Sequence, residues 1–250
     1  MDGELGCRMG RVEQMLRYAY WNTGCNGIVI GLSGGIDSAV AAAFCCRAVG
    51  PDKVLGLSLP SSVSNPADLE DARALCQQLG MPHKTVSIDP MLAGYKTIPE
   101  FVETPYLLGN LMARVRMGVL YYYANRDNRL VCGTSNRSEY MLGYCTKYGD
   151  NAADIQPLLH LYKTDIYVVA QELGIPESIM KKVPSAGLWE GQSDEKEIGL
   201  SYAEIDAALR ALPDRQWQAQ TPAEERVLAL VKKSGHKRLP VPSLLTGSQE

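Results

Sequence analysis

The order of hydrophobic and polar positions along the chain predicts strands that alternate with helices. Short apolar runs rich in β-branched residues are typical of strands covered on both faces. Longer segments between them carry apolar residues three and four positions apart, as a helix with one buried side does. This alternation favours an α/β fold, a doubly wound parallel sheet flanked by helices and joined by right-handed crossovers. The expected strands are Gly27–Ser33, Lys53–Pro60, His83–Asp89 and Arg129–Ser135.

Start and stop signals bound the expected helices. Glycine followed closely by proline ends three of them, and Ser201 and Thr221 stand at the N-cap positions of the last two. Arg137–Pro157 reads as one helical turn followed by a polar loop, and Val183–Gly199 reads as a loop. No segment marks a domain boundary, so we expect one domain over residues 1–250. The helical segments are Ser38–Pro51, Asp68–Pro82, Leu108–Asn125, Thr164–Pro176, Ser201–Leu212 and Pro222–Gly235.

Composition narrows the class of protein. Of the 250 residues, 46% are hydrophobic and 21% are charged, which is ordinary for a globular domain. A net charge of −3 gives no global basic field, so we expect no nucleic-acid partner. No apolar run reaches 18 residues and the N-terminus lacks the apolar core of a signal peptide, so we expect no membrane partner. Seven cysteines without a C-x-x-C pair favour buried thiols in a reducing cytoplasm.

The segment GIVIGLSGGIDSAV, Gly27–Val40, predicts a strand, a tight turn and the start of a helix. Glycines at such a turn let an anion approach backbone N–H groups at the positive end of the helix. A Walker A loop would carry a lysine here, whereas this loop carries Asp37. Asp37 would repel phosphate unless it held Mg²⁺, which carboxylate and phosphate oxygens bind together. The alternative is a plain turn in which Asp37 only complements the helix dipole.

Residues 33–38, SGGIDS, resemble the pyrophosphatase loop of the adenine-nucleotide α-hydrolase-like enzymes, which cleave ATP to AMP and pyrophosphate. Four further segments resemble, in the same order, motifs of ammonia-dependent NAD synthetases, and the similarity runs from about Val12 to Pro242. The resemblance implies a Rossmann-like fold of the α-hydrolase type and a homodimer. The segments are NLMARVRM (Asn110–Met117), TKYGDNAAD (Thr146–Asp154), GQSDEKEIGLSYAEID (Gly191–Asp206) and GHKRLP (Gly235–Pro240).

The resemblance implies an amidation in two steps with ATP, deamido-NAD and ammonia as substrates. The nicotinate carboxylate would take AMP from ATP and release pyrophosphate, and ammonia would then displace AMP. Asp37 and Lys163 match the catalytic positions, and Asp37 and Glu139 match the Mg²⁺ ligands. The positions that match ATP contacts are Gly31, Leu32, Ser33, Gly34, Gly35, Ile36, Asp37, Ser38, Thr134, Lys163 and Ser185.

A second set of positions matches the dinucleotide contacts of the family. Arg114 suits a phosphate or a carboxylate. Arg116 lies about 200° further around the same helix, so the two arginines cannot easily share one ligand. Thr97–Asn110 and Ser185–Glu197 are candidates for mobile lids over the substrates. The positions that match deamido-NAD contacts are Arg114, Lys147, Asp154, His236 and Lys237.

Two departures from the family pattern lie near these positions. GTSNRSE stands where many bacterial members carry GTDHAAE, and GDNAAD stands where GDGGAD is common. The chain shows no stretch for a glutaminase domain, so we expect it to use free ammonia or ammonia from a partner protein. Two other functions stay open: an RNA-thiolating or guanylate-aminating enzyme built on the same loop, and a non-catalytic module that binds ATP.

Overall fold

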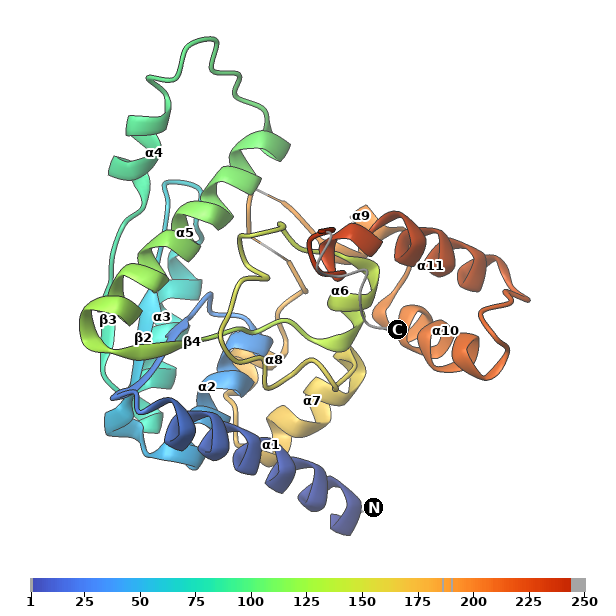
Figure 1. Ribbon diagram of the computed structural model, residues 1–250, viewed down its shortest axis with the longest axis horizontal. Coiled ribbons are helices and arrows are strands. Elements are labelled where there is room, and N and C mark those ends of the chain that lie inside the picture. The colour runs from blue at the N-terminus through green and yellow to red at the C-terminus, as the bar shows by residue number, and fades with distance from the viewer. Residues whose placement is uncertain (1, 186, 190, 244–250) are drawn as a thin grey trace.

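The computed structural model describes residues 2–185, 187–189 and 191–243 and contains a parallel sheet, which lies toward the left of Figure 1 between flanking helices. Among these residues the sheet has four strands in the order β3-β2-β1-β4. β1 lies between β2 and β4, with Ile28 opposite Val54 on one side and Leu130 on the other. The predicted fold class is therefore confirmed. The strands are β1 (Gly27–Gly31), β2 (Val54–Ser58), β3 (His83–Thr85) and β4 (Arg129–Cys132).

The predicted helices are present, and their caps follow the expected chemistry. Ser201 accepts the N–H of Glu204 at the start of α10, and Thr221 accepts the N–H of Glu224 at the start of α11. Gly80 ends α3 with a φ of 70°, which glycine adopts without strain. These helices are α2 (Ile36–Val49), α3 (Pro66–Leu79), α5 (Pro105–Asp127), α6 (Arg137–Leu142), α7 (Lys163–Glu172), α10 (Tyr202–Asp214) and α11 (Pro222–Lys233), and η2 (Gly235–Lys237) follows α11.

Several helices were not predicted from the sequence. α1 (Asp2–Thr23) buries only a narrow stripe that includes Met9, Val12 and Leu16, so its periodicity is weak. The prediction that Val183–Gly199 is all loop was wrong, because α9 (Asp194–Ile198) forms inside it. α9 is too short to show a helical period. The other additions are α4 (Asp89–Tyr95), α8 (Glu177–Met180) and the short 3-10 helix η1 (Pro51–Lys53).

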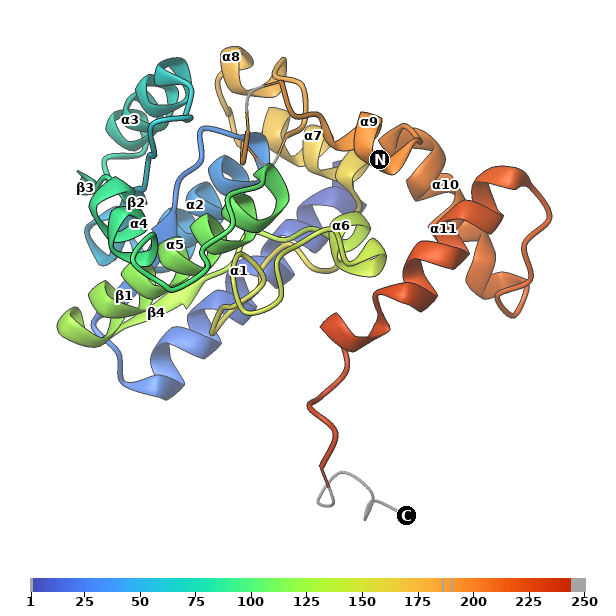
Figure 2. The same cartoon turned by 90° about the horizontal axis from the view of Figure 1, so that it is seen from above.

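The two faces of the sheet carry separate hydrophobic layers. Successive side chains of a strand point to opposite faces, and β1 divides its residues in this way. Ile28 and Ile30 pack with α1, α2, α3 and α7, whereas Val29 packs with α4 and α5. Figure 2 shows these helices on both sides of the sheet. Among the described residues, no helix is long and apolar enough to cross a membrane.

A third layer lies to one side of the sheet, where α10 and α11 project away from the strands (Figure 2). Its buried residues include Ile205, Leu209, Leu212 and Val227, together with residues of α6 and α9. One of the contacts between this helical lobe and the sheet-bearing part of the protein is a buried carboxylate, that of Asp206 in α10.

Asp206 joins the lobe to the start of α7. Its Oδ2 accepts the backbone N–H of Thr164 at 2.8 Å, and its Oδ1 accepts the hydroxyl of Ser138. Ser138 in turn accepts the backbone N–H of Lys163 at 2.9 Å. The first N–H groups of a helix lack partners within the helix, so Asp206 and Ser138 complete the N-terminus of α7.

We expect Asp206→Ala to lower the free energy of unfolding by about 2 to 3 kcal/mol, because it leaves buried donors without an acceptor. Urea unfolding followed by circular dichroism measures this. Asp214→Ala, at the exposed end of the same helix, is the control and should change stability by less than about 0.5 kcal/mol. Equal losses in the two variants would contradict the role given to Asp206.

Candidate functional site

The glycine loop between β1 and α2 has the geometry of an anion site. Gly34 has a φ of +78°, and Gly35 precedes α2 without a side-chain cap for the first helical N–H groups. Ser33 and Ser38 bring their hydroxyl oxygens to 3.3 Å from each other at the mouth of the turn. Ser33 also accepts the N–H of Gly35, and Ser38 donates to the carbonyl of Gly35. Uncapped N–H groups and paired hydroxyls at a helix N-terminus suit a phosphate.

Asp37, in the first turn of α2, meets two residues from distant parts of the chain. Lys163 Nζ lies 2.5 Å from Asp37 Oδ2 and 3.3 Å from Glu139 Oε1. Lys163 is the first residue of α7, and Glu139 lies in α6. The structure therefore brings together the two predicted metal ligands and the predicted catalytic lysine.

Burial decides the electrostatics of this group. The Lys163 side chain is 3% exposed, and those of Asp37 and Glu139 are each 18% exposed. Burial by itself would lower the pKa of Lys163, but the nearby Asp37 and Glu139 outweigh it and raise that pKa. Burial raises the pKa of Glu139 to about 7, against the opposing effect of Lys163. The ammonium is therefore held charged by carboxylates that have no other cation beside them in the described part of the chain.

Asp194 adds a further buried carboxylate that was not predicted. It is 3% exposed and accepts the hydroxyl of Tyr202 at 3.0 Å. The same hydroxyl lies 3.3 Å from Glu139 Oε1. Asp194 Oδ1 is buried without a hydrogen-bond partner, and burial raises the pKa of Asp194. The only sequence signal for this residue was its place in the GQSDE motif.

The donor set of this cluster suits a hard cation. Asp37, Glu139 and Asp194 outnumber Lys163, which leaves a net negative charge when all are ionised. The described residues contain no group of three His, Cys, Asp or Glu side chains arranged around one metal position. Mg²⁺ commonly takes one or two carboxylates and completes its shell with water and substrate phosphate. Asp37 and Glu139 fit that mode of binding.

Asn136 fixes the orientation of Asp37 and was missed from the sequence. It is fully buried and donates through Nδ2 to Asp37 Oδ1 at 2.9 Å. Its Oδ1 accepts the N–H of Glu139 at 3.0 Å, so it is also the N-cap of α6. Asn followed three residues later by Glu is an N-cap pattern that could have revealed the second role. The GTSNRSE segment thus joins both predicted metal ligands through one amide.

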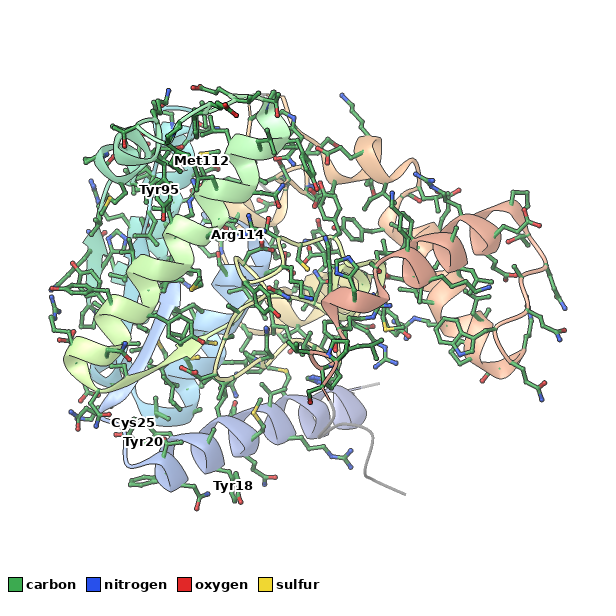
Figure 3. All side chains as sticks on the ribbon, turned by 45° about the horizontal axis from the view of Figure 1, so that its top comes forward. Tyr18, Tyr20, Cys25, Tyr95, Met112 and Arg114 are labelled. Carbon is green, nitrogen blue, oxygen red and sulfur yellow. The ribbon has the colours of Figure 1, made fainter. Side chains whose placement is uncertain are left out.

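The residues predicted to contact the dinucleotide form a second chain of contacts. Arg114 lies on the side of α5 that faces the loop after α6, and its Nε donates to the carbonyl of Lys147 at 3.3 Å (Figure 3). Lys147 Nζ donates to the carbonyl of His236 at 2.8 Å. Lys237 Nζ donates to the carbonyls of Gly143 and Cys145 directly after α6. Four predicted residues are thus neighbours at the end of the helix that carries Glu139.

Asp154 stands apart from those four. Its Oδ2 accepts the N–H of Val131 in β4, and its Oδ1 accepts the hydroxyl of Tyr121 in α5. Arg116, in contrast to Arg114, donates to the carbonyl of Leu59. The two arginines thus donate to carbonyls in different parts of the chain, and the prediction that they do not share one ligand stays a prediction.

The substituted GDNAAD loop is held by its own asparagine. Asn151 Oδ1 accepts the N–H of Tyr148, whose φ is +60°. Its backbone carbonyl accepts the Gln156 side chain. This segment therefore closes as a turn without the two glycines that are common in the family.

Two predicted ATP contacts are not joined to the charged cluster. Thr134 lies two residues beyond the end of β4. Ser185 is exposed, and its hydroxyl accepts the N–H of Gly187 within its own turn. In the described residues no hydrogen bond links Ser185 to the glycine loop.

The two segments predicted to be lids are only partly loops. In Thr97–Asn110, α5 already begins at Pro105 with Thr104 as its cap, so the prediction of a loop was wrong for that half. Ser185–Glu197 includes α9, and its residues 186 and 190 lie outside the described residues. The segments touch, because a Cβ at Gly109 would lie 3.1 Å from Leu188 Cβ.

Comparison with known proteins adds the decisive observation. The model of the NAD synthase family matches residues 9–241. The chain belongs to the NAD synthase family. A relative named NH(3)-dependent NAD(+) synthetase from Methanoregula boonei is 72% identical over 98% of this chain and 99% of its own length.

Two solved structures extend the family comparison. The NMN synthetase from Francisella tularensis has a TM-score of 0.88 at 38% identity and covers 96% of this chain and 98% of its own. The NH3-dependent NAD synthetase from Campylobacter jejuni, in complex with the nitrate ion, has a TM-score of 0.82 at 34% identity. It covers 96% of this chain and 99% of its own.

The role of Asn136 is testable without substrate. We expect Asn136→Ala to lower the free energy of unfolding by about 2 to 3 kcal/mol, from loss of the cap and from buried groups left unpaired. Asn136→Ser keeps a capping oxygen but is too short to reach Asp37, so it should recover about 1 kcal/mol. Urea denaturation of both variants gives these values. Identical stability of the serine and alanine variants would refute the capping role.

Proposed function

We propose that this member of the NAD synthase family is an ammonia-dependent NAD synthetase, a ligase that amidates deamido-NAD at the expense of ATP. The observation that carries the proposal is the meeting of Asp37, Glu139 and Lys163 beside a glycine loop open to phosphate. The loop provides hydrogen-bond donors for the phosphates of ATP. Membership of the family indicates which carboxylic acid is activated.

The reaction has two steps that balance as follows. A carboxylate oxygen of the nicotinate group attacks the α-phosphorus of ATP, the bond to the β-phosphate oxygen breaks, and pyrophosphate leaves. The nitrogen of ammonia then attacks the acyl carbon, AMP leaves with the bonding electrons, and the nitrogen loses a proton. Neither step needs a protein nucleophile. Catalysis depends on aligning the carboxylate with the phosphorus and on neutralising developing charge.

The chain's own residues have distinct parts in this scheme. Residues 31–38 and the N-terminus of α2 bind the leaving pyrophosphate through backbone N–H groups and the two serine hydroxyls. Lys163 contacts the carboxylates of Asp37 and Glu139 and neutralises charge near the α-phosphate. Thr134 and Ser185 bind other parts of ATP.

Asp37 and Glu139 would hold Mg²⁺ in this scheme. When bound, Mg²⁺ supplies Lewis-acid charge for the phosphate oxygens. The buried excess of carboxylates and the unpaired Asp194 Oδ1 support a cation there.

The dinucleotide is proposed to lie against Arg114, Lys147, Asp154, His236 and Lys237. Four of these form one connected group, and three carry cationic side chains that suit the diphosphate of deamido-NAD. The similarity to an NMN synthetase favours a second substrate, the nicotinate mononucleotide, which bears the same carboxylate. Both acids would follow the same chemistry, so selectivity depends on contacts to the second nucleotide.

We also propose a homodimer, a single catalytic domain over residues 1–250 and a cytoplasmic location. A hollow of about 500 Å³ between α4 and α5 supports the homodimer, since Met91, Tyr95 and Tyr122 are exposed beside it. The lobe of α10 supports the single domain, because Asp206 completes α7.

The cysteines do not support the rival sulfur chemistry. Burial raises the pKa of Cys46 and Cys76 to about 12 and that of Cys145 to about 11. A thiol attacks as its thiolate, so burial disfavours the reactive form of these three. This favours amide formation over an RNA-thiolating function.

The product mixture tests the function. The pure protein with deamido-NAD, ATP, Mg²⁺ and ammonium should give NAD, AMP and pyrophosphate in equal amounts, measured by chromatography. Nicotinate mononucleotide in equimolar competition should give less NMN than NAD. Formation of ADP would exclude the proposed bond cleavage, a larger yield of NMN would reassign the substrate, and efficient use of glutamine would exclude ammonia dependence.

Asp37→Asn should lower kcat/KM at least about 100-fold, because it removes a charge that organises the phosphates. The far-ultraviolet circular dichroism spectrum should stay unchanged. Asp52→Asn is the matched control, since the Asp52 side chain is 74% exposed and pairs only with Lys53. Full activity of Asp37→Asn would remove Asp37 from the site.

A further inference from the structure

A second lysine, Lys182, contacts the glycine loop through the carbonyl of Gly34. It follows α8 and precedes Ser185 by three residues. Its Nζ donates to the carbonyl of Gly34 at 3.1 Å and to Asp68 Oδ1 at 2.6 Å. It also lies 2.6 Å from Asp71 Oδ2. An ammonium has three protons, and each of them has an acceptor here.

The acceptors belong to parts of the chain that are far apart in sequence. Asp68 and Asp71 lie in the first turns of α3, and Gly34 lies in the loop. The hydroxyl of Ser178 in α8 donates to Asp71 Oδ1 at 2.9 Å, which ties α8 to the same carboxylate. A Cβ at Gly34 would overlap the backbone of Asp68, so α3 packs directly on the loop. One ammonium thus fastens the loop, α3 and α8 together.

The contact controls the direction of a peptide group. The peptide between Gly34 and Gly35 is planar and trans, so its C=O and N–H point in opposite directions. Glycine permits this peptide to flip at little steric cost. Lys182 holds the carbonyl of Gly34 on one side of this peptide. The N–H of Gly35 therefore points to the opposite side, where it donates to Ser33 Oγ at 3.2 Å. Ser33 and Ser38 then present their hydroxyls together.

We propose that Lys182 is a positioning residue for ATP, which braces the Gly34–Gly35 peptide so that the loop's donors face the pyrophosphate moiety. The inference rests on the proposed function, in which this loop binds the phosphates. Lys182 acts through the loop and leaves the phosphates to the backbone and the serine hydroxyls.

Lys182 differs from an ordinary surface ion pair. Exposed pairs contribute little to stability, but the Lys182 side chain is 26% exposed and also grips a backbone carbonyl. Burial alone would lower its pKa, and hydrogen bonds to Asp68 and Asp71 outweigh burial and raise it. The hydrogen bond to Lys182 lowers the pKa of Asp71. Lys182 and Asp71 are therefore ionised at neutral pH, and their contact does not depend on a change of protonation.

The neighbouring Lys181 provides a matched control. Its side chain is 72% exposed, and it pairs only with the exposed Glu177 within its own helix end. Lys181→Met and Lys182→Met remove the same charge from adjacent positions. A general loss of positive charge would affect both variants, whereas loss of the brace affects only Lys182→Met.

Binding of ATP and of AMP is measured by equilibrium dialysis with Mg²⁺ present. The comparison distinguishes a loss of loop positioning from a general disruption of the nucleotide site. Lys182→Met should weaken ATP about tenfold, the effect of losing one charged hydrogen bond. It should leave AMP within about twofold, since AMP lacks the pyrophosphate moiety. Lys181→Met should leave both unchanged. Unchanged ATP binding, or an equal loss for AMP, in Lys182→Met would overturn the proposal.

Asp71→Asn distinguishes a brace from a direct phosphate ligand. If Lys182 braces the loop, loss of its anchor should weaken ATP binding about threefold. If Lys182 instead bound phosphate itself, freeing it from Asp71 would strengthen ATP binding, and that result would also overturn the proposal. Dialysis reports ATP affinity whether or not NAD is formed. Failure of the brace is thus distinguishable from failure of the proposed function.

Discussion

The buried ammonium of Lys163 is the constraint on which the arrangement of the site depends. An ammonium that is 3% exposed is stable only beside carboxylates, because its hydration is lost. Asp37 and Glu139 supply that compensation from α2 and α6, while the lysine itself begins α7. These helices are far apart in sequence, so their relative positions are set by this charge requirement as well as by apolar packing. Removing either carboxylate alone leaves a buried charge with less compensation.

The same constraint leaves the site prepared for a substrate with its own charge. Asp194 adds a carboxylate whose Oδ1 has no partner, so negative charge exceeds what Lys163 balances. In the proposed reaction, ATP with Mg²⁺ would bring a cation to the carboxylates and phosphates to the N-terminus of α2. Two further residues hold these charged groups in position. Asn136 orients Asp37, and Asp206 acts through Ser138 to fix the backbone of Lys163.

The sequence predicted what is local and missed what depends on tertiary contact. The turn at Ser33–Gly35 was predictable because strand, glycines and helix start are adjacent in the chain. The meeting of Asp37 with Lys163 spans 126 positions and was anticipated only through family motifs. Asn136 was missed because its amide serves a partner 99 positions away. Lys182 was missed because a pair of lysines after a short helix looks the same whether a lysine is solvated or buried against a loop.

The absence of a lysine within the glycine loop now has a structural explanation. Both lysines near the loop are already paired with carboxylates, Lys163 with Asp37 and Glu139, and Lys182 with Asp68 and Asp71. A lysine paired in this way attracts phosphate less than a free lysine does, and it also fixes the groups around it. In the proposed reaction Lys163 neutralises charge near the α-phosphate, while the loop contributes backbone N–H groups and serine hydroxyls. The loop therefore needs no lysine of its own to bind pyrophosphate.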